Sequence, residues 1–173
     1  AASASAYPGP PPSYRPVRVP AAQAAYAVFT SGTTGRPKGV VGPHGAVLAY
    51  AHDHVEHVLR PASARVKRPL RVAHAWSFTF DAAWQPLAAL LDGHSVHIVG
   101  DDAQRDAEAL VQTIGRFGID MLDTTPSMFA QLHDVGLLST VPLAVLALGG
   151  EAVSIATWRL LGDECARTGL TAF

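Results

Sequence analysis

From residue 24 onward, the sequence alternates between short apolar runs and longer segments with helical periodicity. The apolar runs predict β-strands at residues 26–30, 70–73, 95–99, 120–123, 145–148 and 170–173. Helical spacing and terminal signals predict helices at residues 45–59, 82–91, 103–117, 126–133 and 154–167. Strands and helices that alternate in this way indicate an α/β domain, with a largely parallel sheet flanked by helices.

The first 20 residues have a different composition from the rest. They contain six prolines and no hydrophobic period, which is typical of an extended linker, although a motif for a proline-binding partner is an alternative. We therefore expect a poorly ordered linker over residues 1–20 and one partial domain over residues 21–173. The sequence begins with Ala1 and stops inside the last predicted strand, so we expect it to be a piece of a longer protein.

The overall composition argues against several classes of protein. A hydrophobic content of 49% with 16% charged residues is typical of a globular chain. The net charge of −1 gives no electrostatic basis for binding nucleic acid or an anionic membrane. No apolar run approaches the roughly 20 residues that cross a bilayer. The single cysteine, Cys165, suits a reducing compartment, so we expect a cytoplasmic protein.

The segment that follows the first predicted strand has the composition of a phosphate-binding loop. Residues 29–40 read FTSGTTGRPKGV and combine hydroxyl side chains, glycines and a lysine. Glycines let a backbone approach a ligand closely, and hydroxyl groups, backbone amides and lysine all donate to phosphate oxygens. The Walker P-loop is excluded, because its register from Gly32 places Pro37 where a glycine is required and Gly39 where Ser or Thr is required.

Residues 30–39 instead resemble the signature T-S-G-T-T-G-x-P-K-G of the adenylate-forming enzymes, which use ATP to make an acyl-adenylate and release pyrophosphate. The resemblance covers roughly residues 24–173 and implies ATP, with Mg²⁺ in the full-length enzyme, as cofactors. It also implies a set of residues that hold the β- and γ-phosphates: Thr30, Ser31, Gly32, Thr33, Thr34, Gly35 and Lys38. Of these, Lys38 would contact the phosphates during catalysis, whereas the family's main catalytic lysine is absent from this sequence. A Ser/Thr/Gly-rich surface loop is the alternative.

A second motif narrows the family. The sequence Phe80-Asp81-Ala82-Ala83-Trp84 resembles F-D-x-S, which marks the adenylation domains of nonribosomal peptide synthetases. The resemblance implies that Asp81 binds the α-ammonium group of an amino acid, as expected for a carboxylate beside an ammonium. Ala83 stands where the family usually has serine. The alternative is that Asp81 caps a helix by accepting hydrogen bonds from the amides of Ala83 or Trp84.

The segment after the strand at 145–148 resembles the family's G-G-E-A-L motif. Here it reads Gly149-Gly150-Glu151-Ala152, and the carboxyl end of a parallel strand is where open α/β sheets bind ligands. The resemblance implies that the backbone of Gly150, Glu151 and Ala152 borders the adenine of ATP. A glycine turn with a solvated Glu151 is the alternative.

The same resemblance implies a pocket for the amino-acid side chain. Its lining would be Asp81, Ala82, Gln85, Asp123, Ala147 and Gly149. This lining is polar, so we expect a substrate side chain with an amide or a cation that Asp123 and Gln85 can hydrogen-bond. Asp123 could equally be a turn residue that bonds its own backbone.

The histidines do not predict a metal site. His52, His54 and His57 lie within six residues, but no further ligands follow with suitable spacing, and we interpret them as the solvated side of an amphipathic helix. His94 and His97 flank a predicted strand without an evident partner. No role follows from the position of His44.

Together these motifs resemble part of the large N-terminal subdomain of an adenylation domain from a nonribosomal peptide synthetase. The resemblance implies formation of aminoacyl-AMP from an amino acid and ATP, with carrier-protein and condensation domains as partners in the longer chain. The family's later N-x-Y-G-P-T-E motif is not in the sequence, so we expect no adenylation by these 173 residues alone. Two alternatives are a relative of acyl-CoA synthetases and luciferases, and a truncated remnant without catalytic activity.

Overall fold

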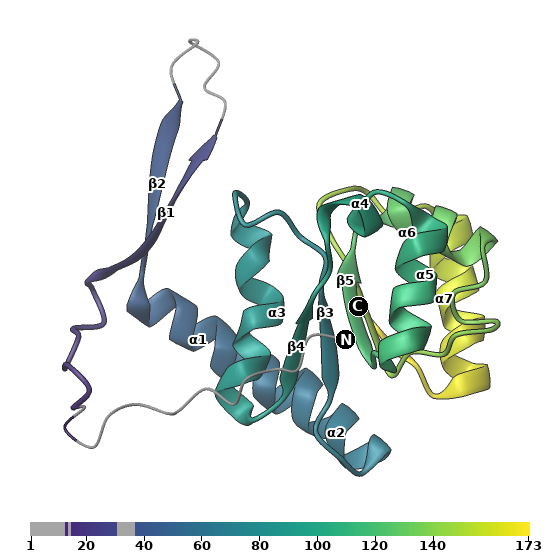
Figure 1. The fold of residues 1–173 in the computed structure, drawn as a ribbon, viewed down its shortest axis with the longest axis horizontal. Helices are drawn as coiled ribbons and strands as arrows, with labels where there is room; N and C mark the ends of the chain where they lie inside the picture. Colours follow the sequence, from purple (N-terminus) through teal and green to yellow (C-terminus); the bar gives the residue numbers. More distant parts are fainter. Residues whose placement is uncertain (1–12, 14, 31–36) are drawn as a thin grey trace.

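The computed structural model describes residues 13, 15–30 and 37–173 of the chain (Figure 1). Its main sheet has five parallel strands in the order β4-β3-β5-β6-β7. The strands are β3 (Arg71–His74), β4 (Ser95–Ile98), β5 (Met121–Thr124), β6 (Val145–Leu148) and β7 (Thr171–Ala172). The predicted α/β fold with a largely parallel sheet is confirmed. The predicted linker falls mostly outside the described residues and stays a prediction.

Helices cover both faces of this sheet (Figure 1). One face carries the helical segment α1 (His44–His54), η1 (Val55–Leu59) and α2 (Arg60–Val66), together with η2 (Asp81–Ala83), α3 (Trp84–Ala88) and η3 (Ala89–Asp92). The opposite face carries α5 (Ala107–Phe117), α6 (Pro126–Asp134) and α7 (Ile155–Thr168), and the short helix α4 (Asp101–Gln104) precedes α5. None of the described helices is both long and apolar enough to span a membrane.

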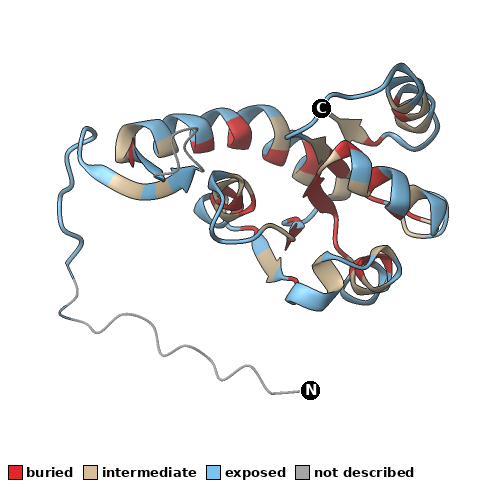
Figure 2. Cartoon of the chain, turned by 90° about the horizontal axis from the view of Figure 1, so that it is seen from above, coloured by how far each residue is buried: buried red, intermediate tan, exposed pale blue. Residues whose placement is uncertain are grey.

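Side chains that alternate along each strand build two hydrophobic cores. Val72, Met121 and Val145 point to one face, where they pack with Leu59 and Leu70. The next residue of each strand points to the other face, where the core includes Ala73, Leu122 and Leu146 with Leu110, Ile114, Phe129 and Leu132. Figure 2 shows the buried positions gathered on the strands and on the inward sides of the helices. Burial on both faces explains why these strands are continuous apolar runs.

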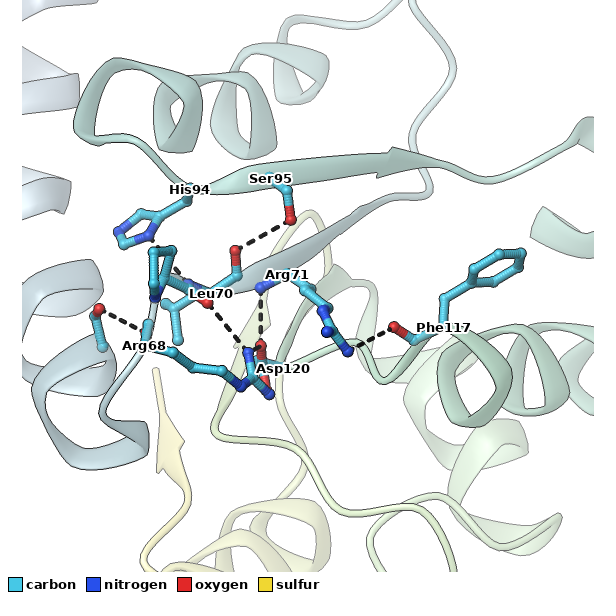
Figure 3. Close-up of polar contacts among 9 residues, drawn as sticks. Arg68, Leu70, Arg71, His94, Ser95, Phe117 and Asp120 are labelled. Carbon is cyan, nitrogen blue, oxygen red and sulfur yellow. Dashed lines mark hydrogen bonds and ion pairs between the residues drawn. The ribbon is translucent and has the colours of Figure 1, made fainter. Parts of the chain in front are cut away.

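The ends of the strands opposite the candidate site are held by a polar network (Figure 3). The guanidinium of Arg68 donates to both carboxylate oxygens of Asp120, at 2.7 and 2.8 Å, and the amide of Arg71 donates to the same carboxylate at 2.8 Å. His94 Nδ1 accepts from the amide of Leu70 at 3.1 Å. His94 therefore has a structural partner that the sequence did not indicate.

The first two strands form a separate antiparallel ribbon. β1 (Ala24–Thr30) pairs with β2 (Lys38–Pro43), and the ribbon projects from the start of α1 away from the main sheet (Figure 1). At its base, the ring of Tyr26 packs on Trp84 of α3, with 5.3 Å between ring centroids. A Cβ on Gly42 would lie 2.2 Å from the Tyr26 ring, so glycine makes room for this contact. β2 is not among the strands predicted from the sequence.

Three predicted helices have different bounds. The helix predicted at 45–59 continues to Val66, because the wide π turn of η1 carries the chain past Pro61, which has no amide hydrogen. The helix predicted at 82–91 consists of three short helical segments and ends at Gly93, with φ of 78°. The helix predicted at 103–117 is divided in two, because the Asp106 carboxylate accepts from the amide of Ala109 and begins α5 anew.

Candidate active site

Two adjoining cavities lie where the carboxyl ends of β5 and β6 approach α1 and the segment after β3. The larger has a volume of about 730 Å³ and the smaller of about 190 Å³. Tyr50, Trp76, Gln85 and Gly149 line both cavities, so the two cavities are adjacent. This edge of a parallel sheet is where open α/β folds bind ligands.

The structure brings all six predicted substrate-binding residues to these cavities. Asp81 and Ala82 line the larger cavity, Asp123 and Ala147 line the smaller, and Gln85 and Gly149 line both. They come from four places in the structure: η2, helix α3, strand β5, and the end of β6 with the residue that follows it. The parallel register of β5 and β6 pairs Asp123 with Ala147, which places the two side by side.

Asp81 is exposed at the larger cavity and does not cap a helix. The N-cap residue of η2 is Phe80, and its carbonyl accepts from the amide of Ala83. The capping role considered for Asp81 is therefore wrong. Among the described residues no hydrogen bond occupies its carboxylate, which leaves both oxygens available to a ligand in the cavity.

Asp123 is a buried acid at the smaller cavity. The residue is 3% exposed, and its Oδ1 has no hydrogen-bond partner among the described residues. Burial raises the pKa of Asp123 to about 7, because a buried carboxylate loses its hydration. The turn that follows is stabilised by Thr125, whose hydroxyl accepts from the amide of Met128 at 3.2 Å. Asp123 thus faces the smaller cavity rather than bonding the turn.

His54 does not lie on a solvated helix face, as the sequence analysis expected. It is 5% exposed and lines the smaller cavity, whereas His52 and His57 are exposed. Its ring stacks on Tyr50 with 5.5 Å between centroids, and burial lowers its pKa. The signal was present in the sequence, since His54 follows Val47 by seven residues and therefore falls on the apolar stripe of the helix.

Trp76 was also missed by the sequence analysis. It lies two residues beyond the carboxyl end of β3, lines both cavities, and has an indole Nε1 without a partner among the described residues. Its place after a parallel strand was the available signal. In the described part of the chain, no group of three His, Cys, Asp or Glu side chains could hold a metal ion.

The glycine turn after β6 is anchored to helix α6. Gly150 has a φ of 82°, a conformation that favours glycine, and the amide of Gly149 donates to the carbonyl of Thr124 at 3.1 Å. The Glu151 carboxylate accepts from the amide and the hydroxyl of Ser127, at 3.0 and 2.8 Å. The glycine turn is therefore present, but Glu151 is bonded to the first turn of α6 rather than only solvated.

Two of the predicted phosphate-binding residues, Thr30 and Lys38, belong to the part of the chain that the structure describes. Thr30 and Lys38 face each other across the ribbon, at the ends of β1 and β2, and both are exposed. Neither lines either cavity. The predicted positions between them, Ser31, Gly32, Thr33, Thr34 and Gly35, lie outside the described residues.

Comparison with known families gives one match over almost the whole chain. Residues 2–170 match the family described as AMP-binding enzyme. Vanchrobactin synthetase VabF of Vibrio anguillarum is 38% identical over 150 residues, which are 80% of this chain and 5% of that protein. Bacitracin synthase 2 of Bacillus licheniformis is 30% identical over 144 residues, which are 81% of this chain and 5% of that protein. The chain thus spans about a twentieth of the length of these relatives.

Solved structures with a similar fold include a protein with an adenylation domain. The fold is similar to that of PA1221, a nonribosomal peptide synthetase protein containing adenylation and PCP domains, with a TM-score of 0.71 and 27% identity. This similarity covers 95% of the present chain and 32% of PA1221. CmiS6 is 26% identical with a TM-score of 0.66, over 91% of this chain and 36% of that protein.

Proposed function

This chain belongs to the AMP-binding enzyme family, and from that premise we propose that the protein containing it activates an amino acid. The reaction would join the amino acid and ATP to give aminoacyl-AMP and pyrophosphate, within a nonribosomal peptide synthetase. The similarity to synthetases and to PA1221 supports this assignment. Because the chain spans only part of these proteins, the activity is proposed for the containing protein and not for the 173 residues alone.

One observation carries the amino-acid assignment. The carboxylate of Asp81 caps no helix and lies at the larger cavity, beside a second cavity that is lined by Asp123. An ammonium group held by Asp81 would fix the substrate at one end, and the side chain of the substrate would extend toward Asp123. A charge-assisted hydrogen bond of this kind both binds and orients the reacting carboxylate. All six substrate-binding residues expected from the sequence are proposed to line the amino-acid site.

ATP would be held at two places. The open backbone at Gly149 and Gly150 suits a planar adenine ring, since a Cβ on Gly149 would meet no atom within 4 Å. The backbone of Glu151 and Ala152 continues this border. The phosphates would be held by the segment from Thr30 to Gly35 and by Lys38, a point charge that can neutralise the leaving pyrophosphate.

Mg²⁺ is proposed only for the containing protein. The described residues offer no cluster of acidic or histidine side chains for a metal ion, so no step is assigned to Mg²⁺ here. The carrier-protein and condensation domains are proposed as partners, and the PCP domain of PA1221 supports the first of them. The single cysteine, Cys165, supports placing the protein in the cytoplasm.

The test is ATP–pyrophosphate exchange by the full-length protein with and without amino acids. We expect amino-acid-dependent exchange that falls at least about 100-fold in Asp81→Ala, because the substrate loses its charged anchor. Asp163→Ala, on the exposed side of α7, is the matched control and should keep wild-type exchange. Exchange that depends on fatty acids and ignores Asp81 would instead support the acyl-CoA synthetase alternative.

A further inference from the structure

Three buried polar atoms without a hydrogen-bond partner among the described residues belong to residues that line the smaller cavity. They are Nε2 of His54, Nε1 of Trp76 and Oδ1 of Asp123. They come from α1, from the segment after β3, and from β5. Buried polar atoms in folded proteins are normally paired, so three of them around one cavity of about 190 Å³ indicate a polar ligand group.

The hydrogen-bonding capacity of these atoms restricts that group. The indole of Trp76 can only donate, an ionised Asp123 can only accept, and Nε2 of a neutral His54 can do either, depending on its tautomer. When Asp123 is ionised, a ligand that satisfies all three must carry both an acceptor and a donor. Ammonium and guanidinium groups have donors only, carboxylates have acceptors only, and aliphatic side chains have neither.

We propose that this cavity recognises the carboxamide of a glutamine- or asparagine-type amino acid. The amide oxygen accepts from Trp76 Nε1, and the amide NH₂ donates to Asp123, with His54 completing the set. Trp76 and His54 are thereby specificity-determining residues in addition to those identified from the sequence. The inference rests on the proposed amino-acid activation and selects the amide from the two substrate classes that the sequence left open.

The ionisable groups that line the cavity fit a neutral ligand. They are Tyr50 and His54 from α1 and Asp123 from β5. Burial lowers the pKa of His54, so its ring is neutral at pH 7, and burial raises the pKa of Asp123 to about 7. A carboxamide can bond either form of Asp123, since the carboxylate accepts from NH₂ and the protonated acid donates to the amide oxygen. A cationic side chain would need the ionised form.

The test is a substrate panel in the exchange assay with the full-length protein. It contains glutamine, asparagine, glutamate, lysine, arginine and norleucine, the last being an unbranched side chain without polar atoms. We expect glutamine or asparagine to exceed every other member by at least about 100-fold in kcat/KM, because a site built for hydrogen bonds rejects analogues that lack them. The wild-type panel needs no variant, so it does not depend on a mutant that folds.

Variants then test the added residues. Trp76→Phe keeps an aromatic ring but removes the N–H, and it should cut the preference for the amide over norleucine about tenfold without changing the KM for ATP. Trp158→Phe, on the exposed surface of α7, is the matched control and should keep the preference. Asp123→Asn should likewise lower kcat/KM for the amide, with Asp163→Asn as its control.

The outcomes are distinguishable. A preference for lysine, arginine, leucine-like or acidic substrates overturns the carboxamide assignment and leaves amino-acid activation standing. An unchanged amide preference in Trp76→Phe overturns the role of Trp76. If no amino acid supports exchange, the proposed function is overturned, and this inference is overturned with it.

Discussion

Glu151 accepts two hydrogen bonds from Ser127, one from its amide and one from its hydroxyl, at 3.0 and 2.8 Å. This pair ties the glycine turn after β6 to the first turn of α6. The negative charge also lies at a helix N-terminus, where free amides and the helix dipole favour it. The backbone that we propose as the border of adenine is therefore held by the Glu151 side chain, which is bonded to α6.

Removing the Glu151 carboxylate should loosen this turn. We expect Glu151→Ala to lower the free energy of unfolding by about 1–2 kcal/mol, since two hydrogen bonds to an ionised group are lost at an exposed position. Denaturant unfolding of the chain measures this change. Ser127→Ala removes only one of the two donors, so the double variant should cost less than the sum of the single variants. Additive costs would show that the pair does not couple.

Asp120 should matter more for stability than its partner Arg68. The carboxylate of Asp120 accepts from Arg68 and also from the amide of Arg71. Asp120→Ala leaves that amide without its acceptor at a largely buried site, so we expect a loss of about 2–3 kcal/mol. Arg68→Met keeps the bond to the amide, and its loss should be smaller because the Arg68 side chain is 42% exposed. Equal losses in unfolding experiments would contradict this ranking.

Lys38 should affect ATP and not the amino acid. In the full-length protein, we expect Lys38→Ala to raise the KM for ATP about tenfold, because a charged hydrogen-bond donor to phosphate is removed. The KM for the amino acid should stay unchanged, since Lys38 lines neither cavity. Arg105→Ala removes an exposed charge elsewhere and serves as the control. A rise in the amino-acid KM alone would place Lys38 in a different role.

The parallel sheet could be predicted because it depends on local sequence, whereas the site residues were expected from the family resemblance. Short apolar runs specify buried strands, and parallel strands present their carboxyl ends at one edge. The resemblance placed Asp123 and Ala147 in one pocket, and the parallel register of β5 and β6 pairs them.

What the sequence did not reveal depends on long-range contacts. Strand β2 contains Gly39 and Gly42, which weaken strand propensity, and it is specified by pairing with β1. The helix predicted to end at residue 59 continues to Val66, and the π turn of η1 carries it past Pro61. His54 was expected on the solvated side of the helix, although its spacing from Val47 places it on the apolar stripe, and the packing of α1 on the sheet buries that stripe.

Burial of Asp123 should make folding stability depend on pH. Its pKa is raised from 3.8 in a hydrated carboxyl to about 7, so the folded state binds more protons than the unfolded state between these values. The contribution of Asp123 to stability is therefore full below about pH 4, falls as the pH rises, and levels off above about pH 7. The shift corresponds to an upper limit of about 4 kcal/mol.

The clearest measurement compares Asp123→Asn with the wild type by denaturant unfolding from pH 4 to pH 8. The variant carries no ionisable group at this position. As the pH rises, the free energy of unfolding of the wild type should therefore fall by a few kcal/mol relative to that of the variant. Burial lowers the pKa of His54, which contributes a slope of opposite sign, and the comparison cancels it because both proteins contain His54. Asp163→Asn is the matched control and should follow the wild type. A constant difference between Asp123→Asn and the wild type at every pH would show that Asp123 stays ionised in the folded protein.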